Sequence, residues 1–250
     1  MNNGHSPAPR NRDLRPTAIF FDMDDTLLDG LTAMQAGWPA VCAGVAPALG
    51  CDPEALRLAI RREAMEFWKD ESLVGHWRLN LDGAREHIVR AALVAESLDA
   101  SLARKIAVDY KASHRQHLRL FDDAIETLEA VRAAGFAVGL ITNGDAPLQR
   151  DKIERFDLAR HMDVIVIEGE FGAGKPARAV FEHALAAVRA EPAQAWHVGD
   201  NLYADIAGAQ QVGIHAVWLH RDRLEIEPGA PALPDRTIAH LGELRQALGA

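Results

Sequence analysis

Three carboxylates follow directly on an apolar run near the start of the sequence. The segment IFFDMDDTLLDG, residues 19–30, places Asp22, Asp24 and Asp25 within four consecutive positions. Packing like charges this close costs energy and raises the pKa values of the groups involved. A bound cation would offset the repulsion, so the segment indicates a cation site lined by carboxylates.

The apolar run before Asp22 is one of five short runs that are apolar on both faces, a pattern typical of parallel strands covered by helices. These runs are residues 17–22, 137–142, 163–169, 195–200 and 215–220. The segments between the later runs have helical spacing, with Gly or Pro at their boundaries. The alternation predicts an α/β fold, a doubly wound parallel sheet with a Rossmann-like core.

One long segment breaks this alternation. Residues 31–119 contain nothing that reads as a strand, and four of their segments carry helical periodicity. We therefore expect a helical cap over 31–119, inserted into a core made of 16–30 and 120–250, after a flexible tail at 1–15. Both connections of the cap fall near the carboxylates, so the cap is placed to act as a lid.

Polar residues follow four of the predicted strands, and the carboxyl ends of parallel strands open onto one crevice. They are Asp22 to Thr26, Thr142 to Asp145, Gly174 to Pro176, and Gly199 to Asn201 with Asp205 beyond. Each motif taken alone is typical of an ordinary turn or helix cap. Four of them in this order, each on a strand end, predict a catalytic site.

Composition narrows the classes of protein. The 250 residues are 48% hydrophobic and 25% charged, as in a globular chain, and the formal charge of −9 argues against nucleic-acid binding. Cys42 and Cys51 lack the spacing of a zinc site or a disulfide scaffold. The sequence contains no apolar run long enough to span a membrane and no signal-peptide core, so we expect a cytoplasmic protein without a membrane partner.

With these motifs in this order, the chain resembles the haloacid dehalogenase superfamily over its whole length after the tail. The matching residues, in motif order, are Asp22, Asp24 and Thr26, then Thr142, then Lys175, then Asp200 and Asp205. The inserted helices resemble the C1-type cap of subfamily I. Residues 142–154 and 168–185 are similar to the branch that contains N-acylneuraminate-9-phosphatase and pyrimidine 5′-nucleotidase.

The resemblance implies a phosphatase that acts on a small phosphate monoester through an aspartyl phosphate, and the residue chemistry suits that reaction. Phosphoryl transfer needs an in-line nucleophile, a cation and positioned donors. Asp22 would attack phosphorus. Asp24 would protonate the leaving alcohol and then deprotonate water, which predicts a pKa above the ordinary value of about 3.9, raised by the neighbouring carboxylates.

The resemblance also implies Mg²⁺ as cofactor. Its ligands would be the side chains of Asp22 and Asp200 and the backbone carbonyl of Asp24. Asp205 would orient a water or Lys175 from outside the coordination sphere. Lys175 would balance the negative charge at Asp22 and on the transferring phosphoryl group.

The expected phosphate-binding residues are Thr26, Thr142 and Asn143. Asp25 is assigned a structural role in the turn. The expected partner is a small phosphorylated metabolite, namely a sugar phosphate, a nucleotide or a phospho-acid, and the expected state is a monomer or a homodimer. Arg78 and Arg115 are both candidates for contacting the distal part of the substrate, and the sequence does not choose between them.

Other readings remain open. A dehalogenase needs no acid at position 24, because halide leaves without a proton. A phosphonatase needs a Schiff-base lysine from the cap, where Lys69, Lys105 and Lys111 are expected on solvated faces. Two alternatives remain: a phosphomutase, and a non-catalytic binding module that kept the fold. Such a module is expected to have lost Asp22, Asp24 or Lys175.

Overall fold

Six parallel strands form one sheet in the order β3-β2-β1-β4-β5-β6. The computed structural model describes residues 16–69, 77–221 and 229–250. The strands are β1 (Ala18–Phe21), β2 (Ala137–Thr142), β3 (Val164–Ile167), β4 (Ala195–Gly199), β5 (His215–Leu219) and β6 (Arg236–Ile238). The predicted α/β class is confirmed, and each of the five predicted runs contains a strand.

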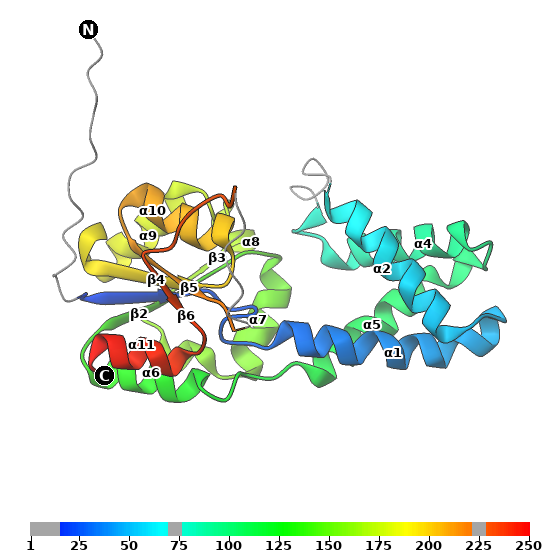
Figure 1. Cartoon of the computed structure of the whole chain (residues 1–250), viewed down its shortest axis with the longest axis horizontal. Helices are drawn as coiled ribbons and strands as arrows, with labels where there is room; N and C mark the ends of the chain where they lie inside the picture. The colour runs from blue at the N-terminus through cyan, green and yellow to red at the C-terminus, as the bar shows by residue number, and fades with distance from the viewer. Residues whose placement is uncertain (1–15, 70–76, 222–228) are drawn as a thin grey trace, which may run out of the picture.

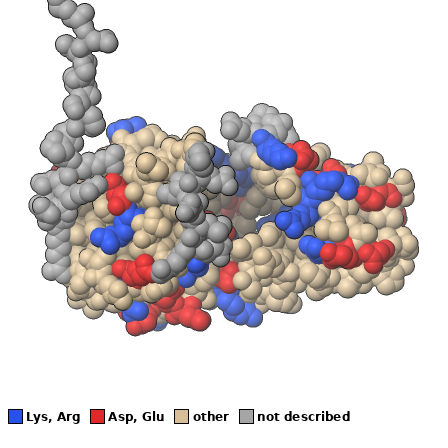
Figure 2. All heavy atoms as spheres, viewed as in Figure 1, with Lys and Arg blue, Asp and Glu red and all other residues tan. Residues whose placement is uncertain are grey.

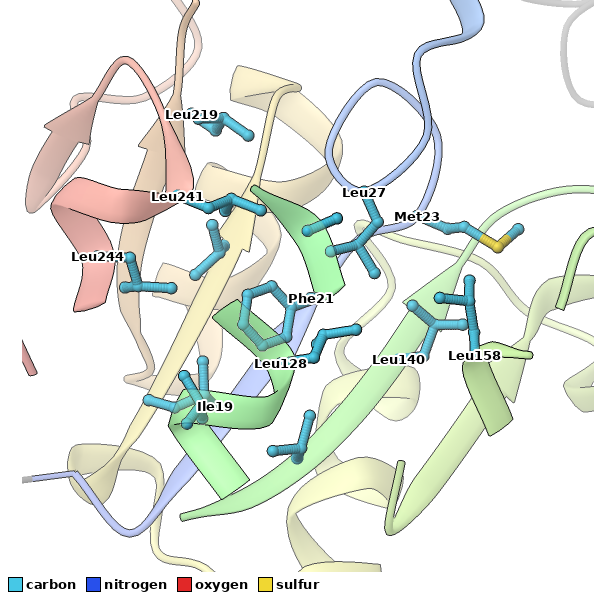
Figure 3. Close-up of a cluster of buried hydrophobic side chains, with 14 of the residues drawn as sticks. Ile19, Phe21, Met23, Leu27, Leu128, Leu140, Leu158, Leu219, Leu241 and Leu244 are labelled. Carbon is cyan, nitrogen blue, oxygen red and sulfur yellow. The ribbon is translucent and has the colours of Figure 1, made fainter. Parts of the chain in front are cut away.

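Side chains alternate between the two faces of this sheet, as the pleat requires. On β1, Ile19 and Phe21 belong to one buried cluster, whereas Ala18 and Phe20 belong to another. Figure 3 shows the first cluster, with Ile19 and Phe21 next to Leu128. Because both faces are buried, the strands read in the sequence as continuous apolar runs.

Helices cover both faces of the sheet (Figure 1). One face is packed by α6 (Ala124–Ala133), α7 (Ala146–Arg155) and α11 (Leu241–Leu248). The other is packed by α9 (Arg178–Val188) and α10 (Gly208–Val212). The shorter elements are η2 (Leu158–His161), α8 (Glu168–Phe171), η3 (Pro192–Gln194) and η4 (Leu202–Ala207).

Most of the described residues between β1 and α6 form a separate group of helices, which we call the helical lobe (30–69 and 77–117). It contains α1 (Gly30–Leu49), α2 (Pro53–Lys69), α4 (Leu81–Ala95), η1 (Ala100–Leu102) and α5 (Ala103–His117). The lobe has its own buried cluster, which includes Cys42, Leu93 and Ile106. In Figure 1, α1 runs out from the core with α5 beside it, and α2 and α4 lie farther along.

The chain order places a crevice at the carboxyl end of β1. From β1 the chain moves to β2 and β3 on one side, and then returns to place β4, β5 and β6 on the other. In open α/β sheets, ligands bind at such a reversal of strand order. Residues that follow β1 and β4 therefore meet at the position where a site is expected.

The strand β6 was not predicted, since it has three residues and two of them are exposed. The flexible tail predicted for residues 1–15 lies outside the described residues. Among the residues that are described, no helix is long and apolar enough to cross a membrane.

Leu128 offers a direct test of the packing beneath β1. Its side chain on α6 is completely buried in the cluster of Figure 3. Leu128→Ala removes buried methyl groups and leaves a cavity, so the free energy of unfolding should fall by about 2–5 kcal/mol in urea denaturation. The matched change Leu233→Ala, at a side chain that is 73% exposed, should alter it by less than about 0.5 kcal/mol.

Candidate active site

Asp22 lies directly after β1, and a buried lysine contacts its side chain. The Asp22 N–H donates to the Val198 carbonyl of β4 at 2.9 Å, which fixes the backbone at the crevice. Lys175 Nζ donates to Asp22 Oδ1 at 2.5 Å and to Asp205 Oδ1 at 2.6 Å. Burial lowers the pKa of Lys175, but Asp205 and Asp22 more than offset this and hold the pKa above its ordinary value. One protonated, buried ammonium thus bridges two buried carboxylates.

Asp205 is held from further directions. Its Oδ1 lies 2.9 Å from His197 Nε2, and its Oδ2 accepts from the Asn201 N–H at 3.1 Å. Burial raises the pKa of Asp205, but Lys175 and His197 outweigh it, so the pKa lies below its ordinary value. Burial keeps the pKa of His197 low, so the neutral ring donates from Nε2. Asp205 therefore remains ionised and fixes Lys175 next to Asp22.

Asp200, after β4, completes a carboxylate cluster. One oxygen from each of Asp22, Asp200 and Asp205 lies within 4.8 Å of the others. Burial raises the pKa of Asp22 to about 7, because this effect and the charge of Asp205 outweigh the lowering by Lys175. Burial and the charges of Asp22 and Asp205 raise that of Asp200 to about 8. Lys175 alone does not compensate three carboxylates, and their hard oxygen ligands suit a divalent cation such as Mg²⁺.

Asp24 lies two residues beyond Asp22 and is bound by two side chains of α7. Lys152 Nζ donates to its two oxygens at 2.7 and 2.8 Å, and Gln149 Nε2 donates to Oδ2 at 3.0 Å. Burial raises the pKa of Asp24, but the Lys152 charge and these hydrogen bonds outweigh it and lower the pKa. The raised pKa that the sequence predicted for Asp24 is therefore wrong, because a cation pairs with this carboxylate.

The predicted phosphate-binding residues have different environments. Thr142 Oγ1 accepts from Gln149 Nε2 at 2.6 Å. The Asn143 side chain exchanges two hydrogen bonds with the backbone of Lys175, at 2.7 and 2.8 Å, and so joins the second motif to the third. Thr26 is completely buried, and its hydroxyl has no hydrogen-bond partner among the described residues. The phosphate contact expected for Thr26 therefore stays a prediction.

Asp25 holds the turn that leads into the helical lobe. Its Oδ1 accepts from the N–H groups of Gly30 and Leu31, at 3.0 and 2.9 Å, in the first turn of α1. Its own backbone is left-handed, with φ of 58°, a conformation that Asp tolerates better than most residues. These contacts agree with the structural role expected for Asp25.

Sequence reasoning missed three residues that contact the predicted ones: Gln149, Lys152 and His197. A signal existed for the first two, because they lie on the same face of α7 as the buried Ile153. His197 lies inside β4, where an alternating pattern gives no information about a hydrogen bond to Asp205.

A cavity of about 770 Å³ lies between the helical lobe and the core, and Asp24 and Lys152 line it. Of the two arginines proposed for distal contacts, Arg115 lines this cavity but donates two hydrogen bonds, both 2.9 Å, to Asp151. Arg78 instead pairs at 2.5 Å with Glu168, a buried carboxylate whose other oxygen accepts from the Gly144 N–H. Arg78 therefore joins the lobe to α8 and, through Glu168, to the loop after β2.

Comparison with known proteins agrees with this geometry. A family model described as haloacid dehalogenase-like hydrolase matches residues 16–213. The phosphoserine phosphatase of Thermus thermophilus is 31% identical over 90% of this chain and 96% of its own. The N-acylneuraminate-9-phosphatase of Mus musculus is 28% identical over 83% and 84%. The magnesium-bound HAD-hydrolase YfnB from Bacillus subtilis superposes with a TM-score of 0.76 over 95% of this chain and all of that one, at 20% identity. The superfamily expected from the motifs is confirmed: the chain belongs to the haloacid dehalogenase-like hydrolase family.

Proposed function

We propose that this chain is a Mg²⁺-dependent phosphatase that hydrolyses a small phosphate monoester through an aspartyl phosphate on Asp22. The observation that carries the proposal is the pair of carboxylates in different settings, two residues apart. Asp22 faces Lys175 and the cluster with Asp200, whereas Asp24 faces Lys152 and Gln149. Separate environments are what a nucleophile and an acid–base group need. The phosphatase names of the Thermus and mouse relatives support the same class of reaction.

In the first step, an oxygen of Asp22 attacks phosphorus and forms the new O–P bond, while the bond to the leaving alcohol breaks. Lys175 favours the ionised nucleophile and attracts the transferring phosphoryl oxygens. Asp24 gives a proton to the departing oxygen. The negative charge of the incoming phosphate favours the protonated form of Asp24, against the effect of Lys152.

In the second step, Asp24 accepts a proton from water, whose oxygen then attacks phosphorus and releases Asp22. The low pKa of Asp24 keeps this base ionised. Thr142 Oγ and the backbone amides near Asn143 would hold the phosphate oxygens during both steps. Gln149 keeps Asp24 and Thr142 together, because one amide nitrogen donates to both.

Mg²⁺ would be held by the side chains of Asp22 and Asp200 and by the Asp24 carbonyl. When bound, it supplies positive charge that stabilises the phosphoryl oxygens and keeps the nearby carboxylates ionised. Asp205 would act from outside the coordination sphere, because Lys175, His197 and the Asn201 N–H already contact it. The rise in the pKa of Asp22 to about 7 and of Asp200 to about 8 supports the need for this charge.

We assign the helical lobe as the cap expected for residues 31–119, which would close over a small phosphorylated metabolite. The proposal includes a cytoplasmic location and a monomeric or homodimeric state. A dehalogenase is disfavoured because halide departs without a proton, so a dehalogenase would need no general acid at Asp24. A Schiff-base mechanism is disfavoured for Lys69 and Lys105, which pair with carboxylates of the lobe outside the cavity lining. Lys111 lines the cavity instead of the solvated face expected for it, and its ammonium pairs with Asp82.

Metal dependence tests this function. With p-nitrophenyl phosphate as substrate, Mg²⁺ should support turnover, and EDTA should lower it by about two orders of magnitude, since a catalytic cation supplies several kcal/mol. Adding Mg²⁺ back should restore the rate. Ca²⁺ should inhibit, because its larger and looser coordination misplaces the nucleophile. Undiminished release of nitrophenol in chelator would contradict the mechanism.

A further inference from the structure

The cavity between the lobes is larger than a phosphate group needs. Its volume of about 770 Å³ falls within the range of small-ligand sites, about 300–1,000 Å³. Asp24 and Lys152 belong to its core wall, whereas Arg85, Lys111 and Tyr110 belong to its helical-lobe wall. A phosphoryl group beside Asp22 would leave most of this space to the rest of the substrate. Residues of both walls would contact that part, and those of the lobe wall include two cations.

Two cations on the lobe wall share one carboxylate. Arg85 Nη1 donates to Asp82 Oδ1 at 3.1 Å, and Lys111 Nζ donates to Asp82 Oδ2 at 2.5 Å. The side chain of Asp82 is 57% exposed, so water weakens its hold on both partners. One positive charge of this trio is left uncompensated. Figure 2 shows Lys and Arg side chains of the lobe beside the hollow between the two lobes.

Most of the other charged groups that line the cavity have contacts of their own. Arg115 and Lys152 are paired with Asp151 and Asp24, and the side chain of Asp25 binds backbone N–H groups. The remaining carboxylate, Asp145, follows β2 on the core wall and makes no ion pair among the described residues. The lining as a whole therefore carries five carboxylates against four cations, and the surplus positive charge is confined to the Arg85–Lys111–Asp82 trio of the lobe wall. His114 also lines the cavity and is neutral at pH 7. Burial is the main reason that its pKa falls to about 4, and the charges of Arg85 and Lys152 act in the same direction.

Arg85 is also held in a fixed position. Its guanidinium carbon lies 5.7 Å from the centre of the Tyr110 ring, and its side chain is only 20% exposed. Tyr110 in turn stacks on Trp38, with 3.9 Å between ring centres. A planar, positioned guanidinium is suited to two parallel hydrogen bonds with a carboxylate.

We propose that Arg85 and Lys111 bind a carboxylate of the substrate at the end away from its phosphate, so that the substrate class is phosphorylated organic acids. This inference rests on the proposed phosphatase function. A carboxylate carries a single negative charge, which matches the one uncompensated charge of the trio. A second phosphate would bring nearly two charges, and a neutral sugar would leave the two cations of the lobe wall with Asp82 as their one carboxylate partner.

The test compares substrates that differ only in the carboxylate. One pair is 3-phosphoglycerate and glycerol 1-phosphate, and a longer pair is 6-phosphogluconate and glucitol 6-phosphate; in each, a carboxylate replaces a hydroxymethyl group. In at least one pair, kcat/KM should favour the acid by about tenfold or more, the value of a charged hydrogen bond. Arg85→Gln and Lys111→Gln should each reduce that preference by about tenfold, mainly through KM. Lys111→Arg should retain it.

Matched controls come from the same helices. Arg90→Gln on α4 and Lys105→Gln on α5 change exposed cations that pair with Glu86 and Asp109 outside the cavity lining. Both should keep the wild-type preference. Should Arg85→Gln fail to fold by circular dichroism, Lys111→Gln, at a side chain that is 47% exposed, still gives the answer.

The outcomes separate the two proposals. No hydrolysis of p-nitrophenyl phosphate with Mg²⁺ would overturn the phosphatase function. Hydrolysis of this ester with no preference for either acid, or with a preference that survives both Gln variants, would overturn the carboxylate site alone. A preference for glucitol 1,6-bisphosphate over 6-phosphogluconate would also overturn it, and would assign the lobe wall to a second phosphate.

Discussion

Asp22→Asn should lower phosphate release by about 10⁴-fold or more, the scale of loss when a covalent nucleophile is removed. The amide has nearly the volume of the carboxylate but cannot attack phosphorus. The fold should remain intact, because Lys175 keeps its contact with Asp205 and one of three mutually repelling carboxylates is gone. Measurements of phosphate release, with thermal unfolding beside them, check both parts.

The control for Asp22→Asn is Asp109→Asn, the same chemical change at an exposed carboxylate that pairs with Lys105 on α5. It should leave turnover unchanged. Mass spectrometry of acid-quenched wild-type enzyme should detect a phosphoryl adduct, and the Asp22 variant should show none. If Asp22→Asn turned over at the wild-type rate, the nucleophile would have to be another residue.

Asp24→Asn should separate substrates by the quality of their leaving groups. An alkoxide departs poorly without a proton, whereas p-nitrophenolate departs readily. For an alkyl phosphate we expect a loss of about 10³-fold in the first step, within the range for general acid catalysis. For p-nitrophenyl phosphate the first step should continue, and the loss of the base should slow the second step instead.

Rapid-quench kinetics distinguish these two effects in the Asp24 variant. The aryl substrate should give a burst of nitrophenol followed by slow turnover, with phosphoryl enzyme accumulating on Asp22. In Asp22→Asn neither the burst nor the adduct should appear. Equal suppression of alkyl and aryl substrates by Asp24→Asn, without a burst, would mean that Asp24 serves only the turn and the metal.

Much of the fold was predictable because both faces of the sheet are buried. The run 137–142 is apolar up to its last residue, Thr142, and coincides with β2. By contrast, β6 contributes one buried residue, Ile238, and so carries almost no pattern. Asp22 lies directly at the end of β1, whereas Lys175 lies beyond α8 and Asp205 lies within η4. The three meet because the segments that follow β1, β3 and β4 come together at one edge of the parallel sheet.

The setting of Asp24 could not be predicted in the same way. Neighbouring carboxylates in the sequence indicated a raised pKa, but the residue that determines it, Lys152, is 128 positions away. Helical spacing placed Gln149 and Lys152 on one face of α7, yet polar residues on a helix ordinarily indicate a solvated face. The tertiary contact between α7 and the loop after β1 buries this polar face against Asp24 instead of leaving it in solvent.

The capping of α1 by Asp25 has a mechanical consequence. This helix has 20 residues and therefore a length of about 30 Å, and its first turn is fastened to the same loop that carries Asp22 and Asp24. A rotation of this helix would therefore pivot about its first turn, next to the loop that carries Asp22 and Asp24. A rotation of about 10° there would displace its far tip by about 5 Å, so the proposed closure of the cap would need almost no displacement of Asp22.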